Sequence, residues 1–258
     1  MTRFNRRTAA AAFTASVLAV AGLAATATPA AAIHGGRNAT AADHPYAMLI
    51  ETADGRQFCG GTLVAPTKVL TAAHCIEDAP EPRDLLVIGG RTALASTKGT
   101  VRHVASVKVH PKFERSTLTY DAAVITLSAP MPYAPLPVAG PKDGALYAAG
   151  RAAQTAGWGR TATGTDATRL KSATLTLAPL TACAPYAEPW EPGALKACGV
   201  PGAGRHDSIC PGDSGGPLIA GGKVIGIVST GNKYCDDQYP VSLYTRADAV
   251  AAGLGLPV

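Results

Sequence analysis

Short apolar runs separated by turns rich in Gly and Pro make up most of this chain. The runs are rich in Val, Ile, Leu and Thr, which favour β-strands, whereas patterns with the helical period are scarce. We expect strands at residues 47–52, 61–65, 68–71, 85–88, 101–110, 123–127, 152–156, 173–178, 216–219, 223–229 and 241–245. Residues 247–254 predict a short terminal helix. The pattern therefore predicts an all-β fold.

A proline-rich segment divides these runs into two similar sets. Residues 129–144 contain five prolines, which cannot donate to the hydrogen-bond ladder of a sheet. We interpret the segment as a crossing between two β halves, near residues 33–130 and 143–258.

The first 32 residues have the composition of a signal peptide. They carry Arg3, Arg6 and Arg7, no acidic residue, and then an alanine-rich stretch that ends in Ala30-Ala31-Ala32. We expect cleavage after Ala32, which makes residues 1–32 a signal peptide and the rest an exported, extracellular domain. A membrane anchor is the alternative, but alanine drives insertion weakly. The Arg6-Arg7 pair is a weak hint of the twin-arginine route.

The charge balance changes when this leader is set aside. The whole chain has a formal net charge of +5, whereas residues 33–258 hold 20 Lys and Arg against 18 Asp and Glu, a net charge of +2. Nothing in that balance predicts a nucleic-acid partner or an anionic membrane surface. The remaining 226 residues are enough to bury a sizeable core.

The chain holds six cysteines, which in an exported protein indicate three disulfides. Six cysteines allow 15 pairings. Proximity along the chain suggests the pairs Cys59–Cys75, Cys183–Cys198 and Cys210–Cys235. A zinc site at Cys59, His74 and Cys75 is the alternative, but no Cys-x-x-Cys or His-x-x-x-His spacing supports it. We expect neither a metal nor a cofactor.

Three polar residues stand in distinctive contexts. Ser214 lies in the stretch Gly-Asp-Ser-Gly-Gly-Pro, whose glycines permit a tight turn with an exposed hydroxyl. His74 follows Thr-Ala-Ala and precedes a cysteine, and Asp121 follows a tyrosine and begins an apolar run. One serine, one histidine and one aspartate of this kind suggest nucleophilic acyl transfer.

In the order His, Asp, Ser, these motifs resemble those of the trypsin/chymotrypsin family of serine proteases, in particular its secreted bacterial members. Further matching stretches are Ile33–Gly36, Cys59–Leu63, Gly157–Gly159, Val228–Gly231 and Leu243–Thr245. The resemblance covers residues 33–258. It implies two six-stranded antiparallel β-barrels with the active site in the cleft between them, and the three disulfides named above. It also implies a monomeric serine endopeptidase that acts on protein or peptide substrates and meets protein inhibitors of proteases.

The family resemblance assigns a role to each matching residue. Ser214 would be the nucleophile, His74 the general base and then acid, and Asp121 the carboxylate that orients His74. The backbone amides of Gly212 and Ser214 would form the oxyanion hole.

The resemblance also implies an activation ion pair. The amine of Ile33, freed by cleavage after Ala32, would pair with Asp213. A secreted form that starts upstream of Ile33 would instead imply a zymogen. His34 departs from the family pattern, where valine is usual, and we expect it to alter the packing around the amine.

For the primary specificity pocket, the residues leave two alternatives open. Counting back from Cys210 places Ser208 at the pocket floor, and Ser242 would line the far wall while Gly231 keeps the mouth open. This arrangement predicts an apolar or aromatic side chain at P1, the substrate residue before the cleaved bond. The alternative is a carboxylate from Asp207, Asp236 or Asp237 in the pocket, which would favour Arg or Lys.

The segment Ser229-Thr230-Gly231 would pair its main chain with an extended substrate, as a sheet edge does. We also expect the hydroxyl of Ser229 to brace Asp121.

Two other classes of protein are alternatives to this interpretation. A non-catalytic relative that binds proteins would usually have lost a triad residue or the Gly-Asp-Ser-Gly-Gly context, and this chain retains both. A serine esterase of another fold would share Gly-x-Ser-x-Gly but place the acid and the histidine after the serine. Here His74 and Asp121 precede Ser214, which disfavours the esterase.

Overall fold

The structure is a computed structural model that describes residues 1–2, 33–160, 168–188 and 190–258. Most of the leader, residues 3–32, lies outside the described residues, as do residues 161–167 and 189. Within the described part, no helix has the length and apolar character needed to cross a membrane.

The first half of the chain closes into an antiparallel barrel. Its strands follow one another around the barrel in the order β2-β3-β4-β7-β6-β5. Their bounds are β2 Ala47–Glu51, β3 Gln57–Ala65, β4 Lys68–Thr71, β5 Leu86–Gly89, β6 Thr100–Val109 and β7 Ala123–Leu127. Large aliphatic side chains such as Met48, Leu63 and Ile125 are fully buried inside it, and burial of apolar surface is the main favourable contribution to folding.

The second half forms another closed antiparallel barrel. Six strands run in the order β9-β10-β13-β12-β11-β8, and pairing of β8 with β9 closes the ring. Their bounds are β8 Ala152–Gly157, β9 Lys171–Ala178, β10 Lys196–Pro201, β11 Pro217–Ala220, β12 Lys223–Gly231 and β13 Ser242–Arg246. The short strand β1 (Arg37–Asn38) pairs with the first two residues of β9, Lys171 and Ser172.

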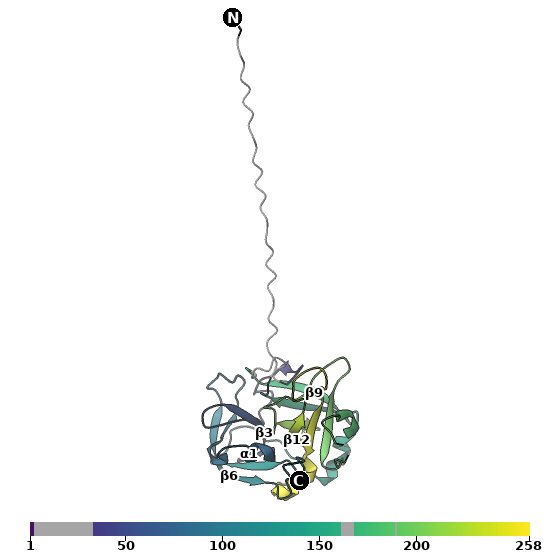
Figure 1. The fold of residues 1–258 in the computed structure, drawn as a ribbon. Helices are drawn as coiled ribbons and strands as arrows, with labels where there is room; N and C mark the ends of the chain where they lie inside the picture. The colour runs from purple at the N-terminus through teal and green to yellow at the C-terminus, as the bar shows by residue number, and fades with distance from the viewer. Residues whose placement is uncertain (3–32, 161–167, 189) are drawn as a thin grey trace.

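The two barrels lie side by side (Figure 1). Strands β3 and β4 of the first barrel contact β11 and β12 of the second. The segment between them, residues 129–144, crosses from one barrel to the other and joins the second through a bridge between Val138 and Val224. The expected all-β fold with two six-stranded barrels is confirmed.

Helical segments are short. Helix α1 (Ala73–Glu77) follows β4 directly, and helix α2 (Ala247–Leu254) follows β13 and ends at Gly255, whose φ of 74° is in the left-handed region that glycine tolerates. Three 3₁₀ segments are present as well: η1 Pro82–Asp84, η2 Pro141–Tyr147 and η3 Leu180–Cys183.

Most expected elements occur near their predicted positions, and α2 has the predicted bounds. The sequence pattern missed β10, because its six residues Lys-Ala-Cys-Gly-Val-Pro include one β-branched residue beside a glycine and a proline, and it also missed β1 and α1. The six cysteines pair as expected, in the disulfides Cys59–Cys75, Cys183–Cys198 and Cys210–Cys235.

Candidate active site

His74 lies at the edge of the first barrel, in the short helix that follows β4. Its imidazole Nδ1 is 2.8 Å from Asp121 Oδ2, and its backbone N–H donates to Asp121 Oδ1 at 2.9 Å. Two contacts to one carboxylate fix the ring orientation. They also make Nδ1 the nitrogen that carries the proton, because a carboxylate can only accept. The other ring nitrogen, Nε2, is therefore the acceptor.

Asp121 is fully buried just before β7. Burial alone would raise the pKa of its carboxyl group. Hydrogen bonds and charge from His74, together with the hydroxyl of Ser229, outweigh that effect and hold the pKa below its ordinary value. Asp121 is thus ionised at neutral pH and stabilises a positive charge on His74.

Ser229 reaches Asp121 because of an irregularity in β12. The pairing of β12 with β13 shifts register between Val228 and Thr230, which leaves Ser229 in a bulge. Bulges re-aim side chains, and the Ser229 hydroxyl donates to Asp121 Oδ2 at 2.7 Å. A residue of the second barrel therefore braces the carboxylate of the first.

Ser214 lies on a turn that both barrels hold. Its carbonyl accepts from the amide of Gly60 in β3 at 2.7 Å, and the next amide, that of Gly215, donates to Val228 in β12 at 2.8 Å. A Cβ atom on Gly215 would lie 2.2 Å from the Thr71 hydroxyl oxygen, so only glycine allows the turn to come this close to the strand that leads to His74. The turn thus brings Ser214 beside the His74 segment.

Two backbone amides of this turn are free to bind a ligand. Gly212 has a φ of 96°, and its carbonyl is turned to accept from the side-chain amide of Gln57 at 2.7 Å. Within the described residues, the amides of Gly212 and Ser214 donate to no other group. Unpaired backbone amides next to a serine hydroxyl are the donors that an oxyanion hole requires.

Asp213 is buried beside the nucleophile turn. Its two carboxyl oxygens accept from the amides of Gly159 at 2.7 Å and Cys210 at 2.9 Å. Burial raises the pKa of Asp213 to about 7 despite these two hydrogen bonds. Among the described residues no cation forms an ion pair with it, and Ile33, which would supply one after cleavage, is itself fully buried.

A cavity of about 190 Å³ opens beside Ser214. Ser229, Thr230 and Gly231 line it, as the sequence predicts for a substrate site. The remaining lining residues are Ile209, Cys210, Pro211, Asn232 and Lys233. Sequence reasoning did not assign Ile209, Asn232 or Lys233 to the pocket, because nothing in the local pattern marks the fold of these loops.

The two serines expected in the pocket lie behind its walls. Ser208 is fully buried, does not line the cavity, and accepts a hydrogen bond from the Asn232 side chain at 2.9 Å. Ser242 accepts from the backbone amide of Ile209 at 3.0 Å. Both serines contact residues that line the cavity, Asn232 and Ile209 respectively, and Asn232 is the lining residue that Ser208 contacts directly.

The three acidic alternatives point elsewhere. The carboxylate of Asp207 is held by the guanidinium of Arg205, including a bond from Nη2 at 2.8 Å. Asp236 accepts from the backbone amide of Gln238 at 3.0 Å. Asp237 lies 2.6 Å from the imidazole of His34, whose hydrogen bond keeps the pKa of that carboxyl low.

His34 therefore ties the segment after Ile33 to the loop that carries Asp237. Its backbone also forms an antiparallel bridge with Ser208. Only the contact with Asp237 depends on the histidine side chain, because the bridge with Ser208 is made by the backbone.

The cysteines beside His74 are not free ligands. The sulfur atoms of Cys59 and Cys75 are bonded to each other, and His74 Nε2 lies 3.8 Å from the sulfur of Cys75. A zinc site would need thiolates, so these three residues do not fit one.

The site can now be compared with known proteins. Residues 33–252 match the family model described as Trypsin. A protein named trypsin from Saccharopolyspora erythraea is 42% identical over 218 residues, covering 84% of this chain and 94% of that protein. A protein named trypsin from Phaedon cochleariae is 32% identical over 227 residues, covering 84% of each chain.

Among solved structures, the human heparin binding protein aligns with a TM-score of 0.70 at 24% identity. The alignment covers 84% of this chain and 92% of that one. At this level of sequence identity, the similarity shows a shared fold and nothing further.

Proposed function

This chain belongs to the trypsin family of serine-type endopeptidases, and we propose that it cleaves peptide bonds with Ser214 as nucleophile, His74 as general base and Asp121 as orienting carboxylate. The observation that carries the proposal is the hydrogen-bonded series Ser229–Asp121–His74, which spans both barrels beside the turn that presents Ser214.

The hydrogen bond between His74 and Asp121 supports a definite order of proton transfers in this proposal. Asp121 fixes the proton on His74 Nδ1, so Nε2 takes the proton of Ser214 as its oxygen attacks the substrate carbonyl. His74 then gives that proton to the leaving amine, which leaves an acyl group on Ser214. Water repeats the sequence in the second half-reaction: His74 deprotonates it, the ester bond breaks, and Ser214 regains its proton.

The amides of Gly212 and Ser214 serve as the oxyanion hole in this proposal. Charge develops on the carbonyl oxygen in each transition state, and two preorganised donors stabilise it without reorganisation. Loss of one such donor costs about 10²–10³ in kcat in related chemistry.

Activation follows from the position of Asp213. We infer that export and removal of residues 1–32 free the amine of Ile33, and that this ammonium pairs with the buried Asp213 carboxylate and fixes the adjacent turn. The mature protein would then be an active extracellular monomer, with protein or peptide substrates and protein inhibitors as its partners. N-terminal sequencing of the secreted form tests this, and a start upstream of Ile33 would imply a zymogen.

For specificity we propose an uncharged P1 side chain, apolar or aromatic. Ile209 and the Asn232 amide line the cavity, Lys233 at its rim repels cations, and the nearby acids have partners elsewhere. The name trypsin, carried by the relatives, gives no support to this preference, and cleavage after Arg or Lys is the competing outcome.

Cleavage of a mixed peptide library by the secreted protein tests this specificity, with Ser214→Ala as the inactive control. We expect cuts after Leu, Phe or Tyr that vanish in the control. Asp207→Asn should leave the P1 profile unchanged, whereas Asn232→Asp should add cuts after Arg or Lys by placing a carboxylate in the cavity. Cuts after Arg or Lys that depend on Asp207, Asp236 or Asp237 would overturn the proposed preference.

A further inference from the structure

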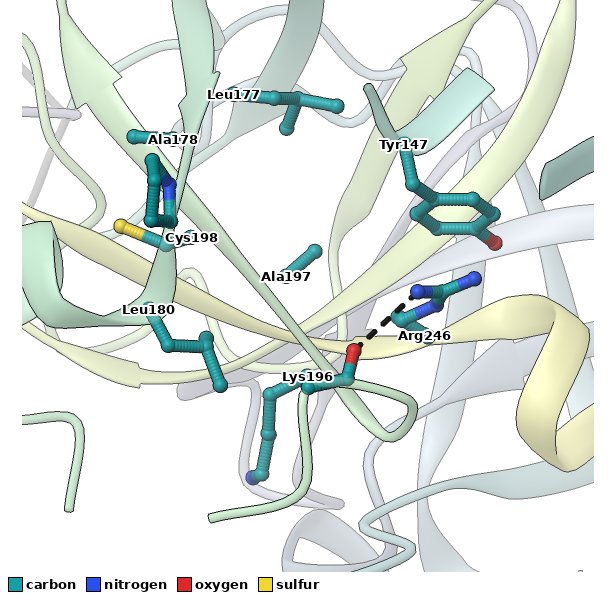
Figure 2. A pocket seen from close by; sticks show the side chains of 10 residues that line it. Tyr147, Leu177, Ala178, Leu180, Lys196, Ala197, Cys198 and Arg246 are labelled. Carbon is teal, nitrogen blue, oxygen red and sulfur yellow. Dashed lines mark hydrogen bonds between the residues drawn. The ribbon is translucent and has the colours of Figure 1, made fainter. Parts of the chain in front are cut away.

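A lysine is buried behind the catalytic aspartate. Lys196 begins strand β10, and only 3% of its surface is exposed. Figure 2 shows its side chain running away from the guanidinium of Arg246, in the wall of a cavity that also includes Leu180. A buried ammonium is costly unless it is paired and hydrogen-bonded, so its partners decide what it does.

The ammonium of Lys196 has three partners. It donates to the carbonyl of Leu118 at 2.8 Å and to the hydroxyl of Ser229 at 3.3 Å, and it lies 3.9 Å from the carboxylate of Glu191. Leu118 precedes Asp121 by three residues, and Ser229 is the residue that donates to Asp121. Two of the three contacts therefore reach the immediate support of the catalytic carboxylate.

The contact with Ser229 fixes the direction of a proton. An ammonium can only donate, so the oxygen of Ser229 must accept from Lys196. The single hydroxyl proton of Ser229 is then directed to Asp121, which can only accept. Without Lys196 the hydroxyl could rotate.

We propose that Lys196 is a positioning residue of the catalytic site. It orients Ser229 and Leu118 around Asp121, and its positive charge lowers the affinity of His74 for a proton. The inference rests on the proposed function, since it assigns a role relative to the triad.

The charges that face Lys196 are consistent with this role. Burial lowers the pKa of Lys196, while the carboxylates of Asp121 and Glu191 oppose that shift and favour the charged form. Arg246, which shares the cavity wall, is held by Asp248 at 2.7 Å and by the carbonyl of Gly193 at 3.2 Å. The positive charge of Lys196 therefore offsets part of the negative charge of Asp121 at His74. The carboxylate of Glu191 in turn offsets part of the charge of Lys196.

The test is the acid limb of the profile of kcat/KM against pH, because this limb reports protonation of the catalytic base in the free enzyme. In Lys196→Met the negative charge of Asp121 is less compensated, so protonated His74 is more stable. We expect the limb to move to higher pH by about one unit, the size expected for loss of one charge about 9 Å away at an effective dielectric constant of about 20.

A second variant should shift the limb in the opposite direction. Glu191→Gln keeps the shape of its side chain but removes the anion that offsets Lys196, so the acid limb should move to lower pH. Lys142 is exposed and, among the described residues, forms no ion pair or hydrogen bond with Lys196, Ser229, Asp121 or Glu191, so Lys142→Met is the control and should leave the profile in place.

Opposite shifts from the two variants support the proposal. An unmoved limb in both, or shifts in the same direction, overturns it and leaves Lys196 a packing residue. If Lys196→Met does not fold, the Glu191→Gln variant alone tests the proposal. An acid limb that Glu191→Gln leaves unmoved would then contradict it. If the unmodified protein shows no peptide cleavage that Ser214→Ala abolishes, the proposed function itself is contradicted. That outcome is distinct from failure of the inference about Lys196, which concerns only the position of the acid limb.

Discussion

At the scale of single residues, Asp213 shows how one buried charge can link processing to activity. Its carboxyl group is buried between the loop of Gly159 and the nucleophile turn, and burial raises its pKa to about 7. A Cβ atom on Gly157 or Gly159 would lie within 2.5 Å of that carboxyl group, so both positions must be glycine. The space is shaped for the carboxylate, and in the proposed activation the ammonium of Ile33 supplies its charge partner.

This environment predicts a pH dependence of stability that differs between the uncleaved and cleaved chains. A carboxyl whose pKa is raised on folding contributes stability at low pH and loses it as pH rises through the folded pKa. For Ser214→Ala protein with two residues ahead of Ile33, we expect the free energy of unfolding to fall between pH 3.8 and about 7. The loss should reach up to about 4 kcal/mol, at about 1.4 kcal/mol per pKa unit.

The matched protein that starts at Ile33 should lack this decline, because its ammonium keeps Asp213 ionised in the folded state. Urea unfolding at a series of pH values measures both curves. Parallel curves for the two proteins would show that the amine of Ile33 does not reach Asp213.

At the scale of elements, strands with β-branched residues at their buried positions were predicted well from the sequence. Strand β10 was missed, because Val200 is its one β-branched residue and the strand forms by pairing with β9 and β13. The bulge at Ser229 could not be seen either, since only the register of β12 against β13 defines it.

Helix α2 ties the C-terminal end of the chain to the first barrel. Its buried residues, Ala247, Val250, Ala251 and Leu254, belong to the same apolar cluster as Leu63, Val69 and Ile125 of that barrel. The same cluster contains Val224 and Ile227 of β12, and Gly253 of the helix lies against His110 beside β6, so the helix packs where the two barrels meet.

Truncation of the helix anchor should destabilise the fold without altering the site. Leu254 is 5% exposed, and Leu254→Ala should lower the free energy of unfolding by about 2–4 kcal/mol. Ala252→Gln on the exposed face of the same helix should change it by less than about 0.5 kcal/mol. Denaturant unfolding compares the two, and equal values for both would show that the helix does not hold the barrels together. The kcat/KM of folded Leu254→Ala should stay near that of the unmodified protein.

At the scale of the whole molecule, the candidate site is assembled across the junction of the barrels. His74 and Asp121 come from the first barrel, and Ser214 and Ser229 from the second. The local contexts of these residues were readable in the sequence because each needs particular neighbours, such as the glycines around Ser214.

The walls of the pocket and the support behind Asp121 were not readable in the same way. Asn232 and Lys196 act through contacts with residues distant in the sequence, Ser208 and Ser229 respectively. No periodicity or spacing marks such contacts, since they depend on how the loops and strands meet in three dimensions.

The most direct test of the account is covalent labelling of the secreted protein with an aryl sulfonyl fluoride, followed by mass spectrometry and a peptide-hydrolysis assay. An activated Ser214 displaces fluoride and keeps the sulfonyl group, so we expect one adduct per chain, located on Ser214, with loss of hydrolysis in proportion. His74→Ala should prevent both labelling and hydrolysis. Hydrolysis that persists in Ser214→Ala, or an active protein that labels at another residue, would contradict the assignment of Ser214 as the nucleophile.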